Sequence, residues 1–127
     1  MGRRTRRNGA HLKRGEVWWA DLGAYRPREQ TGRRPVVIWQ SDTLTRALQS
    51  VLVIPLTTIL ERANLAGTAL ISSSSAGGPP EDSVALAFQI RAIPKSAPQS
   101  KIRDLDDSET EELELATDDA LGRVEPK

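Results

Sequence analysis

The stretch RGEVWWADLG, residues 14–23, opens the folded part of the chain and predicts a β-strand. Its apolar side chains alternate between two faces, as in a strand that is buried on at least one side. Gly23 marks the end of this strand. The alternating sets are Val17 and Trp19 on one face, and Trp18, Ala20 and Leu22 on the other.

The following segments predict further short strands, because they are rich in β-branched residues and separated by turn residues. Pro35 lies at the start of the second strand, and Pro55 predicts that the third strand is an edge strand or contains a bulge. The last segment is either one long strand or two strands joined by a bend. The segments are VVIWQ (36–40), SVLVIPLTT (50–58), TALISS (68–73) and SVALAFQIRAI (83–93), with helical turns expected in SDTLTRAL (41–48) and ILERANLAG (59–67).

The end of the chain predicts a helix over residues 107–121. Ser108 and Glu111 have the spacing of a capping box. Apolar residues then recur at helical spacing, with acidic residues between them. These residues are Leu113, Ala116, Ala120 and Leu121. Many short strands and one terminal helix predict a mainly β fold of the α+β class, a small twisted barrel-like sheet with helices attached.

Charge is distributed unevenly along the 127 residues. Residues 1–34 contain ten Lys and Arg side chains, whereas residues 104–119 contain nine acidic residues and no Lys or Arg. Residues 1–13 are predicted to be a basic disordered arm, followed by one domain over 14–127. A basic surface favours an anionic polymer as partner, but a disordered arm and a solvated helix face explain the same pattern.

Composition excludes several classes of function. The chain contains no cysteine, so disulfides, zinc–thiolate sites and cysteine nucleophiles are absent. No apolar run reaches the roughly 18 residues of a membrane span, and a cytoplasmic protein without a membrane partner is expected. The single histidine, His11, excludes a nuclease with two catalytic histidines. No cluster has convincing metal-ligand spacing, and neither a metal nor another cofactor is expected.

The remaining candidates for chemistry are polar residues at strand ends. Glu29, Gln30, Arg33 and Arg34 close the first long loop, Thr57 and Thr58 end the third predicted strand, and Arg91 lies in FQIRAI. An arginine fork can bind phosphate through two hydrogen bonds, and a neighbouring hydroxyl can complete the contact. These residues alone indicate an anion-binding site.

Four motifs in order, RGEVWWADLG, EQTGRRPVVIWQSD, VLVIPLTT and EDSVALAFQIRAIPK, resemble those of the MazF/PemK toxins from Arg14 to about Leu121. The resemblance implies the SH3-like, small twisted β-barrel of the Kid/CcdB/MazF type with a C-terminal helix. It also implies a homodimer, a MazE-like antitoxin as partner, and sequence-specific cleavage of single-stranded RNA. Pro27 and Arg28 stand where many relatives have Gly-Ser, so the loop that contains them is expected to be stiffer and more basic than in those relatives.

The same resemblance assigns residues to roles. The arginine of the family's R-P-V motif corresponds to Arg34 and the catalytic threonine to Thr57, while Glu29 is the nearby carboxylate that could assist as a base. The resemblance extends RNA binding to residues around this pair. They are Arg28, Gln30, Arg33, Thr58, Gln89 and Arg91.

RNA cleavage needs no metal here, because the 2′-OH beside the scissile phosphate is an internal nucleophile. The expected products are a 2′,3′-cyclic phosphate and a 5′-OH, with loss of translation and growth as the consequence. Two other functions stay open on the sequence: a non-catalytic RNA-binding barrel, and a gyrase-poisoning toxin with the same fold. The three tryptophans are expected in the core or a dimer interface rather than as base-stacking platforms.

Overall fold

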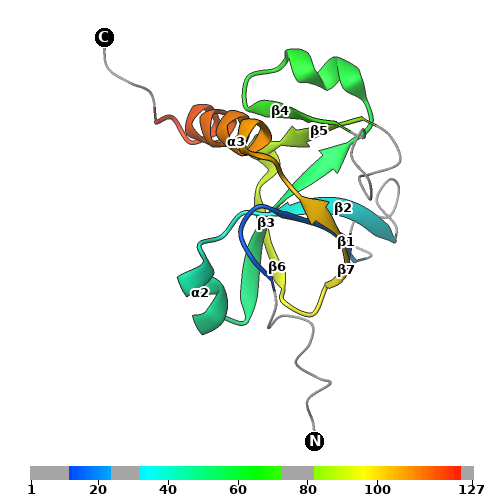
Figure 1. Ribbon diagram of the computed structural model, residues 1–127, viewed down its shortest axis with the longest axis vertical. Helices are drawn as coiled ribbons and strands as arrows, with labels where there is room; N and C mark the ends of the chain where they lie inside the picture. Colours follow the sequence, from blue (N-terminus) through cyan, green and yellow to red (C-terminus); the bar gives the residue numbers. More distant parts are fainter. Residues whose placement is uncertain (1–11, 24–31, 73–81, 124–127) are drawn as a thin grey trace, which may run out of the picture.

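The computed structural model describes residues 12–23, 32–72 and 82–123. Its strands form one antiparallel sheet in the order β4-β5-β3-β2-β1-β7, with β6 paired to β3 (Figure 1). The strands are β1 (Glu16–Asp21), β2 (Arg33–Ile38), β3 (Ser50–Thr57), β4 (Thr68–Ile71), β5 (Ser83–Leu86), β6 (Arg91–Pro94) and β7 (Pro98–Asp104). The helices are α2 (Asp42–Ala47), η2 (Leu60–Asn64), η3 (Ala87–Gln89) and α3 (Asp107–Ala120).

The predicted class, mainly β with a C-terminal helix, is confirmed. Among the described residues no pairing joins β7 to β4, so the strongly bent sheet does not close into a complete barrel. The predicted segment 83–93 is two strands joined by η3, as one of the two interpretations had it. Leu12, which the sequence assigned to the arm, is only 4% exposed and packs in the core.

Pro55 predicted either an edge strand or a bulge, and the edge strand is wrong because β3 is central. It pairs with β2 on one side, and with β6 and then β5 on the other. The change of partner explains how a central strand accommodates proline. Pairing with β6 ends at Val53 and pairing with β5 begins at Leu56, so the missing N–H of Pro55 falls in the gap between the two ladders.

Both faces of the bent sheet are covered by apolar side chains. One cluster places Leu113 and Ala116 of α3 against residues of β3, β4 and β5 such as Leu56. The other cluster joins Leu12 to residues of β1, β2 and β3 such as Trp18. Because the middle of β2 and β3 is buried on both faces, polar side chains on these two strands are confined to their ends.

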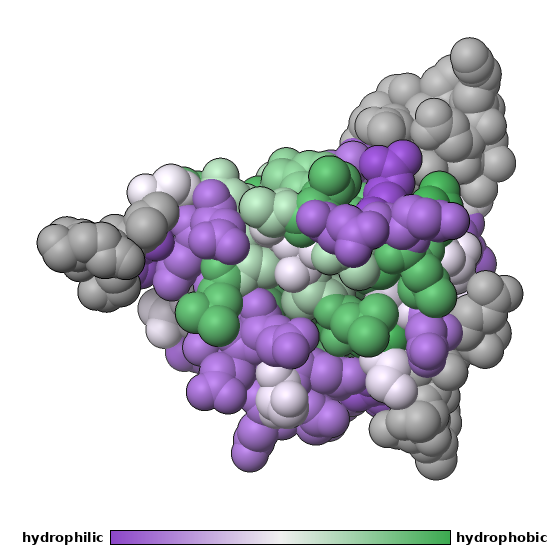
Figure 2. Space-filling model, turned by 90° about the horizontal axis from the view of Figure 1, so that it is seen from above, coloured by the Kyte–Doolittle hydropathy of each residue, from purple (hydrophilic) through white to green (hydrophobic). Residues whose placement is uncertain are grey.

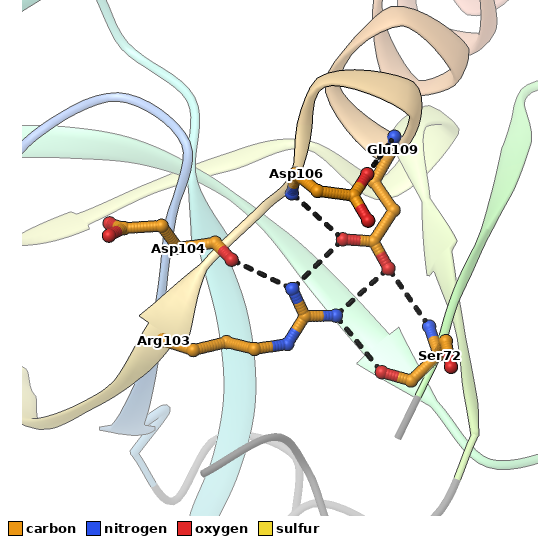
Figure 3. Close-up of polar contacts among 5 residues, drawn as sticks. All are labelled: Ser72, Arg103, Asp104, Asp106 and Glu109. Carbon is orange, nitrogen blue, oxygen red and sulfur yellow. Dashed lines mark hydrogen bonds and ion pairs between the residues drawn. The ribbon is translucent and has the colours of Figure 1, made fainter. Parts of the chain in front are cut away.

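Helix α3 is anchored by an ion pair between Arg103, at the end of β7, and Glu109 (Figure 3). Both nitrogens of the guanidinium fork donate to the carboxylate at 2.9 Å, and both side chains are 9% exposed. The carboxylate also accepts from the backbone N–H groups of Ser72 and Asp106. Burial alone raises the pKa of Glu109, but these hydrogen bonds outweigh it and hold the pKa below its ordinary value.

The same contacts correct the predicted capping box. The helix spans Asp107–Ala120, close to the predicted range, but its box is Asp106 with Glu109 rather than Ser108 with Glu111. Both Asp106 with Glu109 and Ser108 with Glu111 have the spacing of a capping box. The ion pair with Arg103 favours the box that contains Glu109, because this glutamate faces the sheet. Leu121, counted in the apolar stripe, is 66% exposed.

Hydrophobic side chains are also exposed on the end of the molecule that carries η2 and β4. Figure 2 looks onto this end and shows hydrophobic residues interleaved with hydrophilic ones. No helix in the described ranges is long and apolar enough to span a membrane. The exposed residues in this region are Ile59, Leu60, Leu65, Leu70 and Phe88.

Candidate functional site

Arg34 and Thr57 lie across from each other on neighbouring strands. Arg34 is the second residue of β2, and Thr57 is the last residue of β3. The register pairs Val36 with Pro55, and continuing it by two residues places Arg34 opposite Thr57. Opposite residues of an antiparallel pair project to the same face. The structure therefore brings the two predicted catalytic side chains together.

A hydrogen bond fixes the Arg34 side chain beside β3. Its Nη1 donates to the carbonyl oxygen of Leu56 at 2.9 Å, and the residue is half-buried. A guanidinium carries five N–H donors in a rigid plane, so this bond also sets the direction of the other donors. The plane is held next to Thr57, where a bound phosphate would meet both side chains.

Thr57 and Thr58 differ in their setting, although the sequence alone gave them equal weight. Thr57 is half-buried at the end of β3, and its Oγ1 accepts a hydrogen bond of 3.2 Å from the backbone N–H of Ile59. This contact orients the hydroxyl and leaves its own proton to donate. Thr58 follows the strand and is exposed. The geometry favours Thr57 as the partner of Arg34.

Arg91 shares this face of the sheet but lies farther along it. It pairs with Val53 of β3, which lies four residues before Thr57 and projects to the same face. Four residues of strand span about 13 Å, so the backbone of Arg91 lies about that far along the sheet from Thr57. Gln89 is in η3 and exposed. Both residues therefore lie on the β6 side of β3, away from the Arg34–Thr57 pair.

Arg33 projects to the opposite face from Arg34, because the two are consecutive in β2. Its Nη2 donates to Ser100 Oγ at 3.2 Å, and its guanidinium lies over the Trp19 ring, 5.0 Å from the centroid. The sequence did not indicate Ser100, since the polar strand β7 was not predicted. The predicted residues Arg28, Glu29 and Gln30 lie outside the described residues.

Trp18 and Trp39 are buried, as predicted. Trp18 Nε1 donates to Glu16 at 2.9 Å, and Trp39 Nε1 donates to Thr117 at 2.9 Å. Trp19 is half-buried and is the exception. Within residues 12–23, 32–72 and 82–123, no group of three or more His, Asp or Glu side chains converges as metal ligands would.

The fold and the site define a small, mainly β protein with an arginine–threonine pair at the ends of two neighbouring strands. Residues 13–120 match the family of PemK-like, MazF-like toxins of type II toxin-antitoxin systems. The chain belongs to this family. The match covers all the described strands and α3.

Individual relatives agree with this assignment. The chain is 35% identical over 111 residues to the endoribonuclease MazF of Staphylococcus saprophyticus, covering 87% of this chain and 92% of the relative. It is 33% identical over 114 residues to the endoribonuclease EndoA of Bacillus subtilis, covering 90% and 97%. A solved mycobacterial endoribonuclease in complex with its cognate antitoxin has the same fold, with a TM-score of 0.74, 23% identity and coverage of 91% and 99%.

The family predicted from the four sequence motifs is thereby confirmed. The prediction of an endoribonuclease toxin agrees with the names that the relatives carry. The assignment of individual residues to catalysis and RNA binding stays a prediction.

Proposed function

We propose that this chain is the toxin of a type II toxin-antitoxin system and acts as a metal-independent, sequence-specific endoribonuclease on single-stranded RNA. The observation that carries the proposal is the hydrogen bond from Arg34 Nη1 to the carbonyl oxygen of Leu56, the residue before Thr57 on the neighbouring strand. An arginine fork and a hydroxyl on one face at one sheet end suit a phosphodiester. The family supplies the biological setting.

In the proposed reaction the 2′-oxygen of the RNA attacks the neighbouring phosphorus while the bond to the 5′-oxygen breaks. The 2′-OH loses its proton to a base, and the 5′-oxygen gains one as it leaves. The products are a 2′,3′-cyclic phosphate and a 5′-OH. The substrate holds nucleophile and phosphorus together, so the enzyme has to align them and stabilise charge.

Arg34 supplies that stabilisation in the proposed mechanism. Its planar fork donates to the non-bridging oxygens as negative charge develops on them. Thr57 donates its hydroxyl proton to the same phosphate or relays a proton. Glu29 is the proposed base, because it is the carboxylate nearest in sequence to Arg34 on the preceding loop. Arg34 as general acid is less favourable, since the pKa of a guanidinium lies far above neutral pH and the group releases its proton reluctantly.

Flanking nucleotides are assigned to the surrounding polar residues. Arg91 and Gln89 are proposed to contact the strand on one side of the cleaved bond, and Arg33 on the other. Thr58 is next to Thr57 and exposed, which suits a contact to the RNA backbone. Arg28 and Gln30 are proposed to contact RNA from the loop that precedes β2.

The proposed partners are a second copy of the chain and a MazE-like antitoxin. The antitoxin follows from the family, whose members belong to two-component systems. The exposed apolar residues of η2 and β4 are consistent with surface that a protein partner covers. The proposed location is the cytoplasm, where messenger RNA is translated and where its cleavage stops growth.

A cleavage assay with a long RNA of defined sequence tests the proposal. Purified protein is incubated with the RNA in EDTA, the new 5′ ends are sequenced, and the 3′ ends are examined for cyclic phosphate. Cleavage at a short recurring sequence with these ends is expected. Binding without cleavage would instead support a non-catalytic RNA-binding barrel. A complex with DNA gyrase and no RNA cleavage would support the gyrase-poisoning alternative.

A further inference from the structure

Arg33, Trp19 and Ser100 form a flat polar platform across three strands. The Arg33 side chain starts on β2 and crosses β1, where its guanidinium lies over the indole of Trp19. Its Nη2 reaches Ser100 on β7, which is the register partner of Trp19. The guanidinium is therefore held at two points, with one face toward the indole. Arg33 as a whole is exposed.

A second arginine–tryptophan pair in the chain shows what a purely structural contact looks like. The Arg14 guanidinium lies 3.8 Å from the ring centroid of Trp39, which is buried. Arg14 is also paired with Glu114 at 3.5 Å, so its charge is compensated within the protein. Among the described residues, Arg33 forms no such ion pair. Its partners are a neutral hydroxyl and an aromatic ring.

We propose that the Arg33–Trp19 platform stacks one nucleobase of the RNA, next to the phosphate held by Arg34 and Thr57. This inference rests on the proposed endoribonuclease function. Arginine planes and aromatic rings are the surfaces on which proteins stack the unpaired bases of single-stranded RNA. Here the indole supports the arginine plane from below, and the outer face of the plane receives the base.

The position of the platform relative to Arg34 supports this assignment. Arg33 and Arg34 are consecutive, so their Cα atoms are about 3.8 Å apart. They project to opposite faces at the first two positions of β2, where the strand begins. A single strand of RNA that crosses this end of the sheet can place a phosphate at Arg34 and the adjoining base at Arg33. The platform then aligns the cleaved bond without touching it.

The preorganised plane also explains why arginine is used here rather than lysine. A guanidinium already fixed by Trp19 and Ser100 loses little side-chain freedom when a base stacks on it. A lysine at this position keeps the charge but has no plane on which a base can stack. Arg33→Lys therefore separates stacking from simple attraction to phosphate.

The test measures binding and does not depend on cleavage. Short single-stranded RNA oligomers with 2′-O-methyl groups throughout are resistant to attack by the 2′-oxygen, and a series of them lacks one base at each position in turn. Wild type, Arg33→Ala and Arg33→Lys are titrated with each oligomer. Removing a stacked base weakens binding roughly 5- to 150-fold, and on the intact oligomer Arg33→Lys should show a similar loss and Arg33→Ala at least as large a loss. Arg46→Ala removes an exposed arginine of α2 as the matched control.

The stacked base is identified by the coupling between two changes, the substitution of Arg33 and the removal of one base from the oligomer. Where the base that stacks on Arg33 is missing, wild type and Arg33→Lys should bind equally, while the other abasic oligomers keep the difference. An equal loss on every oligomer, or wild-type binding by Arg33→Lys, would overturn the stacking proposal. RNA cleavage is measured separately with unmodified RNA. A protein that shows the coupling but cuts no RNA would refute the nuclease function and leave the platform standing.

Discussion

The guanidinium of Arg34 donates a hydrogen bond of 2.9 Å to the carbonyl oxygen of Leu56, the residue immediately before Thr57. This contact crosses from the start of β2 to the end of β3 and joins the two motifs that the sequence singled out. It holds a rigid cation beside a hydroxyl that is itself oriented by the N–H of Ile59. The Arg34 and Thr57 part of the site is therefore built by the pairing of β2 with β3.

Substitution of either member of this pair is expected to remove most of the activity. Arg34→Ala and Thr57→Ala should each lower the single-turnover rate of RNA cleavage by about 10²- to 10³-fold, as loss of one charge-stabilising donor does. Arg34→Lys should also lose most activity, because a point charge does not reproduce the planar fork. The rates are measured on the RNA in which cleavage sites have been mapped.

Exposed residues of the same types on α2 provide the controls. Arg46→Ala and Thr43→Ala should cleave at the wild-type rate, and all variants should unfold at a similar temperature. Wild-type rates for both Arg34→Ala and Thr57→Ala would show that the site has been assigned wrongly.

Cleavage is expected to be unaffected by chelation of metal ions. The nucleophile belongs to the RNA, so the reaction needs the ribose 2′-OH rather than a metal-bound water. Activity in EDTA should equal activity without it, and deoxyribose at the scissile position alone should abolish the cut there. An activity lost in EDTA and restored by magnesium or manganese would contradict the mechanism.

Strand periodicity and turn residues predicted most of the sheet. The alternation in residues 14–23 corresponds to β1, and the β-branched runs correspond to β2, β3 and β4. Strand β7 was missed because PQSKIRD has one large apolar residue, Ile102, and no alternation. Among the strands that the structure describes, β7 pairs only with β1, so it is an edge strand and can be polar. Its position depends on tertiary contacts that no local pattern records.

The candidate site was predictable only in part for a related reason. The sequence indicated Arg34 and Thr57 as polar residues at strand ends, and the family resemblance assigned both of them to catalysis. That they lie opposite each other follows from the register between β2 and β3, which the sequence alone does not fix. The contact between Arg33 and Trp19 was not foreseen, because it requires an arginine side chain to cross a strand toward the unpredicted β7.

The Arg103–Glu109 pair is expected to be a major source of stability. Glu109→Gln keeps the size of the side chain and can keep the capping contact with the Asp106 N–H. It removes the negative charge that forms the ion pair with the buried guanidinium of Arg103. Breaking one partner of a buried ion pair costs about 3–5 kcal/mol in the free energy of unfolding. Urea unfolding at neutral pH measures this loss. Glu114→Gln, which affects an exposed pair with Arg14, should change it by less than about 1 kcal/mol.

The contribution of Glu109 is also expected to depend on pH in one direction. Its pKa is lower in the folded protein than in the unfolded chain, so its ionisation stabilises the fold at neutral pH. That stability is complete above the ordinary pKa of glutamate, about 4.3, and is lost as the pH falls through the lower folded value. The difference in unfolding free energy between wild type and Glu109→Gln should therefore shrink on acidification. If the difference in unfolding free energy stayed constant as the pH fell through this range, it would contradict the lowered pKa of Glu109.

The chain is expected to assemble with a second copy of itself. The strands of this short chain are rich in apolar residues, and some large apolar side chains, such as Leu70 and Phe88, are exposed. Exposed apolar surface of this kind suggests a surface that a second copy covers. Purified protein at micromolar concentration should sediment as a two-fold dimer. A stable monomer at that concentration would refute the dimer.

The antitoxin is expected to be an acidic, partly disordered peptide with apolar anchors that occupies the basic segment 24–34 and displaces RNA. Opposite charges should speed its capture, so the association rate should fall as salt rises. Because ordering a disordered peptide lowers its affinity, a large wrapped interface is expected. RNA cleavage is measured with the co-encoded peptide bound at saturation, and it should be suppressed. Full activity of the saturated complex would show that the peptide does not block the RNA site.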